Sequence, residues 1–139
     1  MARVNFYSLR HDDTEARLQF ACRLCEQLWR QGHALCMLTQ DEDEARAFDQ
    51  LLWTFSPESF VPHALYSDAP ENCPVLIDWN PTRFNGGSLL NLSDALPPQH
   101  ESFDSIAEFI FNNEEAKALS RRKWASYKQW GHELLHRQV

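Results

Sequence analysis

The chain has 139 residues, of which 43% are hydrophobic and 24% charged, a composition typical of one globular domain. The formal net charge of −7 argues against a protein that coats nucleic acid, because phosphates would meet the same overall sign. No apolar run has the length of a signal peptide core or a membrane span. We therefore expect a single cytoplasmic domain over residues 1–139.

The first quarter of the chain reads as a strand followed by a helix. Residues 4–9 are β-prone, and residues 16–31 carry apolar side chains at helical spacing up to the stop at Gly32. Three residues are suitable caps for the start of this helix: Asp12, Asp13 and Thr14. Cys22 and Cys25 lie inside the helix rather than at its amino end, so we predict buried thiols and no redox or metal site.

The next segments repeat the strand and helix order. Residues 34–38 form a continuous apolar run, which is typical of a strand buried on both faces. Residues 39–44, of which four are acidic, then open a helix whose apolar positions include Ala45, Phe48 and Leu52. This alternation predicts an α/β fold: one three-layer domain with a mostly parallel sheet and helices on both faces, Rossmann-like in appearance.

The second half adds strands and a final helix. Residues 75–79 and 88–92 read as strands, and residues 105–111, which are ambiguous between helix and strand, are assigned to a strand because the segment is short. A last helix is expected over residues 113–132. Its predicted buried stripe consists of Ala116, Leu119, Tyr127, Trp130 and Leu134.

Catalytic and cofactor motifs are missing from the sequence. The turn after the first strand, residues 9–13, holds no glycine, so backbone amides could not approach a pyrophosphate closely. No His-Glu-x-x-His or Gly-x-Ser-x-Gly pattern occurs. We predict no nucleotide site, no metal site and no catalytic residues, which makes a small α/β enzyme the least favoured class of function.

An aromatic stretch over residues 51–65 is interrupted by Pro57 and Pro62, so no helix or central strand is expected to run through it. Trp53, Phe55 and Phe60 lie in this stretch. Two interpretations remain open. The aromatic side chains cap the core, or Trp53, at the end of the preceding helix, stays at the surface as a docking anchor.

Charge is segregated toward the carboxyl end. From Lys117 onward the sequence holds six basic residues and one acidic residue. Lys117, Arg121, Trp124 and Lys128 recur at helical spacing and form a second stripe on the last helix. The stripe is either a solvated face or a binding patch. A patch of cations and an indole suits nucleic acid, or an acidic peptide that ends in an aromatic residue and a free carboxylate; the acidic remainder of the chain favours the peptide.

Two segments carry a family resemblance. Leu52-Trp53, followed by Pro57-Glu58-Ser59-Phe60-Val61-Pro62-His63, and the carboxyl-terminal run of residues 121–131 together resemble the chi subunit of bacterial DNA polymerase III. The resemblance implies an α/β fold without nucleotide chemistry. It also implies a one-to-one heterodimer with the psi subunit, which tethers chi to the clamp loader, and a separate surface for the acidic tail of single-stranded DNA-binding protein.

When the family's motifs are matched to this sequence, the resemblance implies a tail-binding surface made of Trp53, Lys117, Arg121 and Trp124, with Arg122 and Lys128 at its rim. The implied function is a non-catalytic adaptor in DNA replication. The alternative is direct binding of single-stranded nucleic acid through the carboxyl-terminal basic helix. No motif locates the psi-binding surface.

Overall fold

The protein is built on one parallel sheet. The computed structural model describes residues 2–10, 13–56, 58 and 60–139. In this part of the chain seven strands pair in the order β3-β4-β2-β5-β6-β1-β7, and every neighbouring pair is parallel. The strands are β1 (Arg3–Ser8), β2 (Leu35–Leu38), β3 (His63–Leu65), β4 (Val75–Asp78), β5 (Ser88–Asn91), β6 (Ser105–Ile110) and β7 (Glu133–Gln138). The helices are α1 (Thr14–Arg30), α2 (Glu42–Thr54) and α3 (Glu114–Gln129), with the short 3-10 helices η1 (Tyr66–Asp68) and η2 (His100–Ser102).

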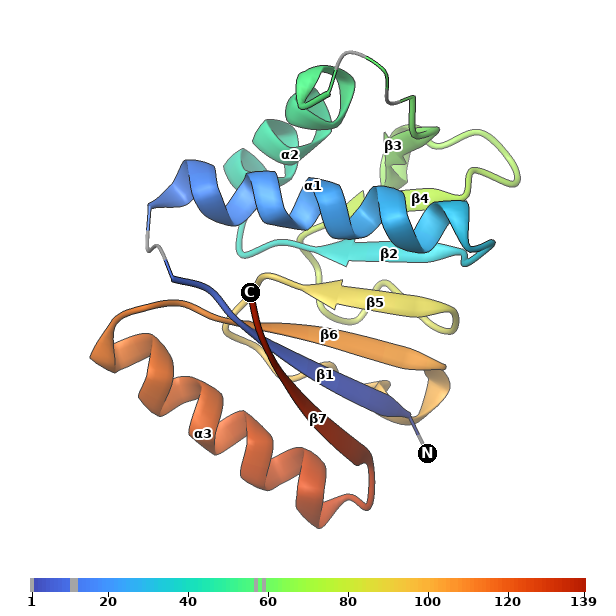
Figure 1. The fold of residues 1–139 in the computed structure, drawn as a ribbon. Coiled ribbons are helices and arrows are strands. Elements are labelled where there is room, and N and C mark those ends of the chain that lie inside the picture. The colour runs from blue at the N-terminus through green and yellow to red at the C-terminus, as the bar shows by residue number, and fades with distance from the viewer. Residues whose placement is uncertain (1, 11–12, 57, 59) are drawn as a thin grey trace.

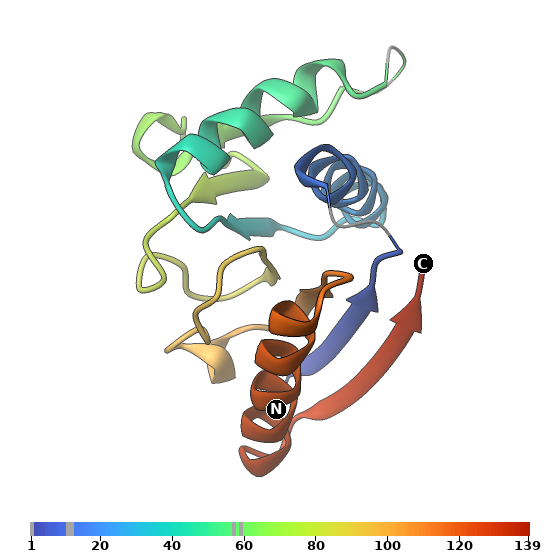
Figure 2. The same cartoon turned by 90° about the vertical axis from the view of Figure 1, so that its left-hand side faces the viewer.

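The helices cover both faces of the sheet. Helices α1 and α2 lie on one face and α3 lies on the other (Figures 1 and 2). Each face has its own core: Leu18 and Phe48 pack in the first, whereas Phe6 and Tyr127 pack in the second. The predicted three-layer α/β domain with a mostly parallel sheet is confirmed.

The central strands β2 and β5 are buried along their whole length. The continuous apolar run of β2 suits this position, because a strand covered on both faces needs no polar side. In β5 the buried polar side chains of Ser88 and Asn91 are hydrogen-bonded. The strands expected over residues 34–38 and 88–92 are therefore confirmed within a residue at each end. The ambiguous segment 105–111 is also a strand, β6, as predicted.

Polar side chains cap the amino ends of all three helices. Asp13 accepts from the amide of Ala16 at 2.8 Å and Asp41 accepts from the amide of Glu44 at 2.9 Å. Asn113 caps α3 in the same way. Each cap satisfies one amide that has no partner inside its helix, a contribution of about 1 kcal/mol. Asp13 is one of the caps predicted for α1, while Asp12 lies outside the described residues.

The end of the chain differs from the prediction. Helix α3 ends at Gln129 rather than near residue 132, and Leu134 belongs to strand β7 instead of the helix. The turn explains the stop, because Gly131 adopts a φ of +87° and the amide of His132 donates to Tyr127 O, a pattern that closes helices. Strand β7 then pairs in parallel with β1.

The aromatic stretch contains a short edge strand that the sequence did not predict. Strand β3 follows Pro62 directly and pairs with β4 alone. An edge position suits a strand next to proline, since proline lacks a donor. The expectation that no central strand crosses this stretch is confirmed for its described residues; Pro57 and Ser59 lie outside them.

Three cysteines behave as the sequence predicts. Cys22, Cys25 and Cys36 are buried and free, and burial raises the pKa of each thiol to about 12. They are core residues rather than nucleophiles. In the described residues no helix is long and apolar enough to span a membrane. The glycine-free turn over residues 9–13 is described only in part, because His11 and Asp12 lie outside the described residues.

The turn before β5 yields a stability prediction. Gly86 and Gly87 both have positive φ, but a Cβ on Gly87 would lie 3.0 Å from Ala34 O, whereas one on Gly86 would meet nothing within 4 Å. We expect Gly86→Ala to cost about 1–2 kcal/mol of unfolding free energy from the backbone conformation alone. Gly87→Ala should cost about 1–2 kcal/mol more, because backbone must move. Urea denaturation of both variants checks this, and equal costs would contradict it.

Candidate functional site

A groove lies between α3 and the sheet. It encloses about 410 Å³, and its walls come from β1, β6, β7 and α3. We call it the α3 groove, and its lining residues are Phe6, Ser8, Ile110, Lys117, Ser120, Arg121, Trp124 and His136. The strands supply Phe6 and Ile110 together with the polar Ser8 and His136, and the helix supplies the cations.

The helix contributes residues at the spacing that the sequence predicted. Lys117, Arg121 and Trp124 lie at steps of four and three residues, which places them on one side of a helix. The structure brings all three together in the α3 groove. Arg121 is exposed and Lys117 partly so, which leaves both cations open to a ligand.

Trp124 belongs both to the core and to the groove. Its ring packs on Phe6 with the centroids 5.1 Å apart and the planes tilted by 56°. The indole is half-buried and its remaining surface lines the α3 groove. Packing on one side holds the ring in one orientation, so the free side is a preformed apolar wall.

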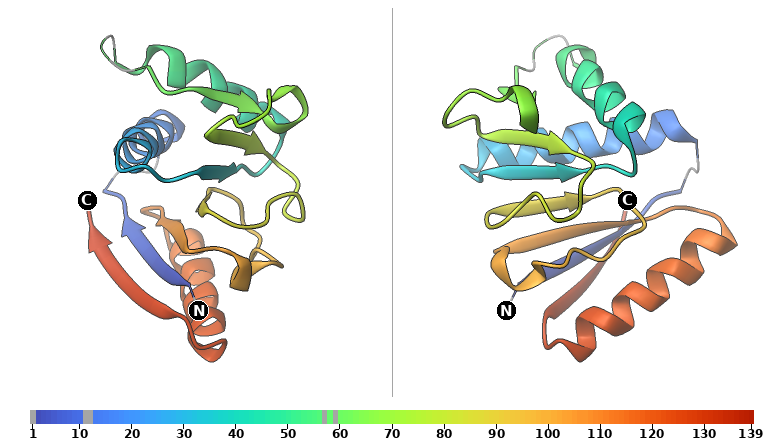
Figure 3. Two further views of the ribbon diagram at one scale, coloured as in Figure 1. Left: turned by 90° about the vertical axis from the view of Figure 1, so that its right-hand side faces the viewer. Right: turned by 180° about the vertical axis from the view of Figure 1, so that it is seen from behind.

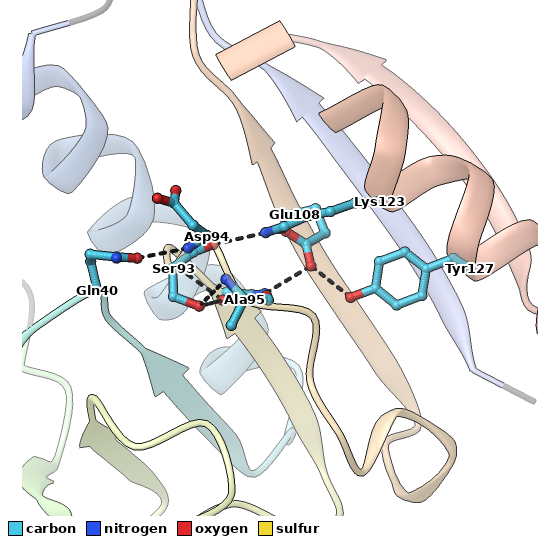
Figure 4. Close-up of polar contacts among 8 residues, drawn as sticks. Gln40, Ser93, Asp94, Ala95, Glu108, Lys123 and Tyr127 are labelled. Atoms are coloured by element: carbon cyan, nitrogen blue, oxygen red, sulfur yellow. Dashed lines mark hydrogen bonds and ion pairs between the residues drawn. The ribbon is translucent and has the colours of Figure 1, made fainter. Parts of the chain in front are cut away.

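A buried charge cluster determines where α3 lies. Lys123 and Glu108 are 5% and 2% exposed, and their charged groups are 2.9 Å apart. Lys123 also donates to Ser93 O at 2.8 Å, and the Tyr127 hydroxyl donates to Glu108 at 2.6 Å (Figure 4). Each charged group is therefore paired and hydrogen-bonded, as a buried charge must be.

The cluster also reaches the central strand. Asn91 on β5 donates to the second oxygen of Glu108 at 2.9 Å and its own oxygen accepts from Ser93. Burial, and then the nearby Glu108 carboxylate, raise the pKa of Tyr127, so this hydroxyl stays a donor. The result is a polar link from β5 through β6 to the middle of α3, next to the residues of the α3 groove.

The buried face of α3 differs from the one that the sequence predicted. The buried residues of α3 are Ser120, Lys123 and Tyr127, so of the predicted stripe only Tyr127 is fully buried. Trp130 is 41% exposed and stacks on His100 with the ring centroids 4.0 Å apart. The predicted stripe was wrong because it was built from apolar spacing alone, whereas the buried side of α3 includes Lys123, which Glu108 neutralises.

The structure does not bring Trp53 to the α3 groove, and this part of the predicted surface is wrong. Trp53 ends α2 on the opposite face of the sheet, where its ring contacts Phe60 and His63 at centroid distances of 5.4 and 4.4 Å. Helices α2 and α3 lie at opposite sides of the molecule in Figure 3. Of the two interpretations left open for the aromatic stretch, the structure agrees with a Trp53 at the surface, since its side chain is 46% exposed.

The remaining predicted residues lie at the periphery. Arg122 and Lys128 are exposed on α3, but neither lines the α3 groove. Sequence reasoning missed Phe6, Ile110 and His136, which do. Phe6 and Ile110 carried only a strand signal, and His136 could not be placed without strand β7. Within the described residues, no group of three or more His, Cys, Asp or Glu could hold a metal ion.

The fold and the groove define a small all-parallel α/β domain with a basic, partly aromatic surface groove. Residues 1–135 match the family described as "DNA polymerase III chi subunit, HolC". The chain is 34% identical over 134 residues to DNA polymerase III subunit chi of Pseudomonas aeruginosa, covering 96% of this chain and 94% of that protein. It is 29% identical to the chi subunits of Escherichia coli K12 and Haemophilus influenzae, over 96% and 94% of this chain and 96% and 93% of those proteins. The chain therefore belongs to the chi-subunit family, accessory subunits of a DNA replication polymerase.

The buried cluster yields a second stability prediction. Lys123→Met leaves Glu108 as an unpaired buried charge, so we expect a loss of about 3–5 kcal/mol in unfolding free energy. Adding Glu108→Gln should recover much of this loss, because the amide is neutral and still bonds Tyr127. Lys128→Met, on the exposed side of the same helix, should change stability by less than about 0.5 kcal/mol. If Lys123→Met were as mild as Lys128→Met in urea denaturation, the cluster would not hold α3.

Proposed function

We propose that this chi-family protein is a non-catalytic adaptor. It links the clamp loader, through the psi subunit, to the acidic carboxyl-terminal tail of single-stranded DNA-binding protein. The observation that carries the proposal is the α3 groove, in which Lys117 and Arg121 lie beside the half-buried Trp124. Cations next to an apolar wall suit a peptide end that has both a carboxylate and an aromatic ring.

Each residue of the groove has a chemical role in this proposal. Arg121 binds the terminal carboxylate, since the planar guanidinium matches a carboxylate with two parallel hydrogen bonds. The free side of the Trp124 indole, which Phe6 supports from below, forms the wall against which the terminal aromatic side chain packs. Lys117, one helical turn before Arg121, attracts the acidic residues upstream in the tail.

The size and charge of the groove favour a peptide over a polyanion at this place. About 410 Å³ falls in the range of small-ligand pockets and suits a few residues of an extended peptide end. Lys123, one of the cations of the carboxyl-terminal segment, is buried against Glu108 and cannot meet phosphate. The alternative of nucleic-acid binding along the basic helix loses a cation that the sequence had assigned to it.

The psi subunit needs a surface away from the groove if both partners bind together. Trp53 and Phe60 are 46% and 69% exposed, their rings are in contact, and they lie on the opposite face of the sheet. Adjacent exposed aromatic side chains are typical of interface hot spots. We assign the Trp53 and Phe60 pair to psi binding, in place of the role in tail binding that the resemblance implied for Trp53.

Arg121→Ala should weaken binding of an acidic tail peptide by about tenfold to a hundredfold, because a charge-assisted hydrogen bond contributes about 1.5–3 kcal/mol. Amidation of the peptide's terminal carboxylate should weaken binding to the same extent. Combining the two changes should add little, since both remove one interaction. Fluorescence anisotropy with a labelled peptide measures all three.

Arg122→Ala is the matched control, because Arg122 is the exposed neighbour that does not line the groove. It should change the affinity by less than about twofold. Carboxylate capture would be the wrong mechanism if the amidated peptide bound the wild-type protein as tightly as the free acid. Equal losses in Arg121→Ala and Arg122→Ala would indicate unspecific charge attraction instead.

Phe60→Ala should reduce co-purification of psi with tagged chi, while Arg121→Ala should leave it unchanged. The reason is that truncating an exposed aromatic anchor removes about 1–4 kcal/mol of binding energy. The tail peptide should bind Phe60→Ala and the wild type equally well. Loss of psi with Arg121→Ala and its retention with Phe60→Ala would reverse the assignment of the two surfaces.

A further inference from the structure

A second groove lies on the face of the sheet opposite α3. It encloses about 730 Å³ between α1 and the strands β1 and β7. A hollow of about 490 Å³ next to it shares Phe20, Arg23 and Val139, so the two are continuous. We call the combined surface the α1 groove. Figure 2 shows α1 nearly end-on, with β7 at the outer edge of the sheet on the same side.

The wall of the α1 groove is a polar stripe of the helix. Gln19, Arg23, Gln27 and Gln31 recur at steps of four residues, which places them along one side of α1. Arg23 and Gln27 are exposed. Among the described residues, the Arg23 guanidinium has no carboxylate within 4 Å. The opposite side of α1 packs in the core, so this stripe faces outward.

The floor follows from the pairing of β1 and β7. Arg3, Asn5 and Tyr7 alternate along β1 and line the groove together, because every second side chain of a strand points to one face. The register places Arg137 of β7 beside Tyr7, and Arg137 donates to the Asn5 side chain at 3.3 Å. The row from Arg3 to Tyr7 is about 13 Å long at 3.3 Å per residue.

The charge of this surface opposes the charge of the whole chain. Arg10 and Arg23 line its walls and Arg137 its floor, and among the described residues no Asp or Glu side chain lines either hollow. The total count is 13 basic against 20 acidic residues, so this clustering is not what composition alone would give. At the amino end of β1 the positive charge of Arg3 is neutralised, because Arg3 pairs with Glu133 at 3.4 Å.

We infer that the α1 groove binds single-stranded nucleic acid, with phosphates at Arg10, Arg23 and Arg137. Arginine binds phosphate oxygens with two parallel hydrogen bonds. Asn5, Gln27 and Gln31 carry amides, which both donate and accept and therefore match base edges. A single-stranded nucleic acid supplies phosphates for the arginines and base edges for the amides in one ligand. A replication subunit of the chi family works where single-stranded DNA is present.

The test measures binding of a labelled oligothymidylate of about twelve nucleotides by anisotropy. We expect Arg23→Ala combined with Arg137→Ala to weaken binding at least about tenfold in the full-length protein. Three phosphate contacts predict a slope of about −2 for log K against log salt between about 50 and 200 mM, and the double variant should flatten it. Both arginines are at the surface, and circular dichroism verifies that the variant folds.

Two variants serve as matched controls. Arg30→Ala changes an exposed arginine of the same helix that pairs with Glu26 and lines neither hollow, and Arg121→Ala changes the α3 groove. Both should bind the oligonucleotide within about twofold of wild type. The double variant should still bind the acidic tail peptide normally, which separates this proposal from the proposed tail site.

Three results would overturn the inference. The first is wild-type affinity for the oligonucleotide weaker than about 100 μM at the lowest salt. The second is a loss of binding in Arg121→Ala or Arg30→Ala as large as that in the double variant. The third is displacement of the oligonucleotide by an acidic peptide at similar concentration through Arg23 and Arg137, which would make an acidic protein segment the occupant.

Discussion

The ion pair between Lys123 and Glu108 is the interaction on which the arrangement of the carboxyl-terminal half depends. Two charges in the core are stable only as a pair with every remaining donor and acceptor satisfied, and here Tyr127, Asn91 and Ser93 complete the set. These contacts form together at one position of α3 along β6, so a shifted helix would break the cluster. Because Trp124 follows Lys123 and Arg121 precedes it by two positions, the same position of α3 sets the geometry of the α3 groove. The stabilising cluster and the proposed binding surface thus share one turn of helix.

The second constraint is the parallel sheet, which separates the surfaces. Helix α2 ends on one face with Trp53 and Phe60, while α3 carries its cations on the other. Two partners on these surfaces would not compete for space, which an adaptor requires. The α1 groove lies on the same face as α2 but at the opposite edge, beside β1 and β7. A net charge of −7 conceals this division, because six of the 13 basic residues line the two grooves.

Local signals in the sequence were enough for much of the fold. The apolar run of β2, the caps of the helices and the spacing of Lys117, Arg121 and Trp124 are all properties of short segments. Strand β7 could not be predicted in this way, because its partner β1 lies about 130 residues away in the sequence. In addition, the adjacent Leu134 and Leu135 also suit a helix. The burial of Lys123 was not predictable from the sequence, because only Glu108, on another element, makes a buried lysine stable. Trp53 was misplaced because the face that each helix covers is decided by the order of the strands.

The central claim is that the acidic tail binds at α3 and not at the end of α2, and the indole groups of the protein can report it directly. In nitrogen-15 spectra each tryptophan side chain gives its own N–H signal, and the chain has five. On titration with the tail peptide, the account predicts a progressive shift of the Trp124 indole signal while that of Trp53 stays in place. A shift of the Trp53 signal with an unmoved Trp124 signal would contradict it.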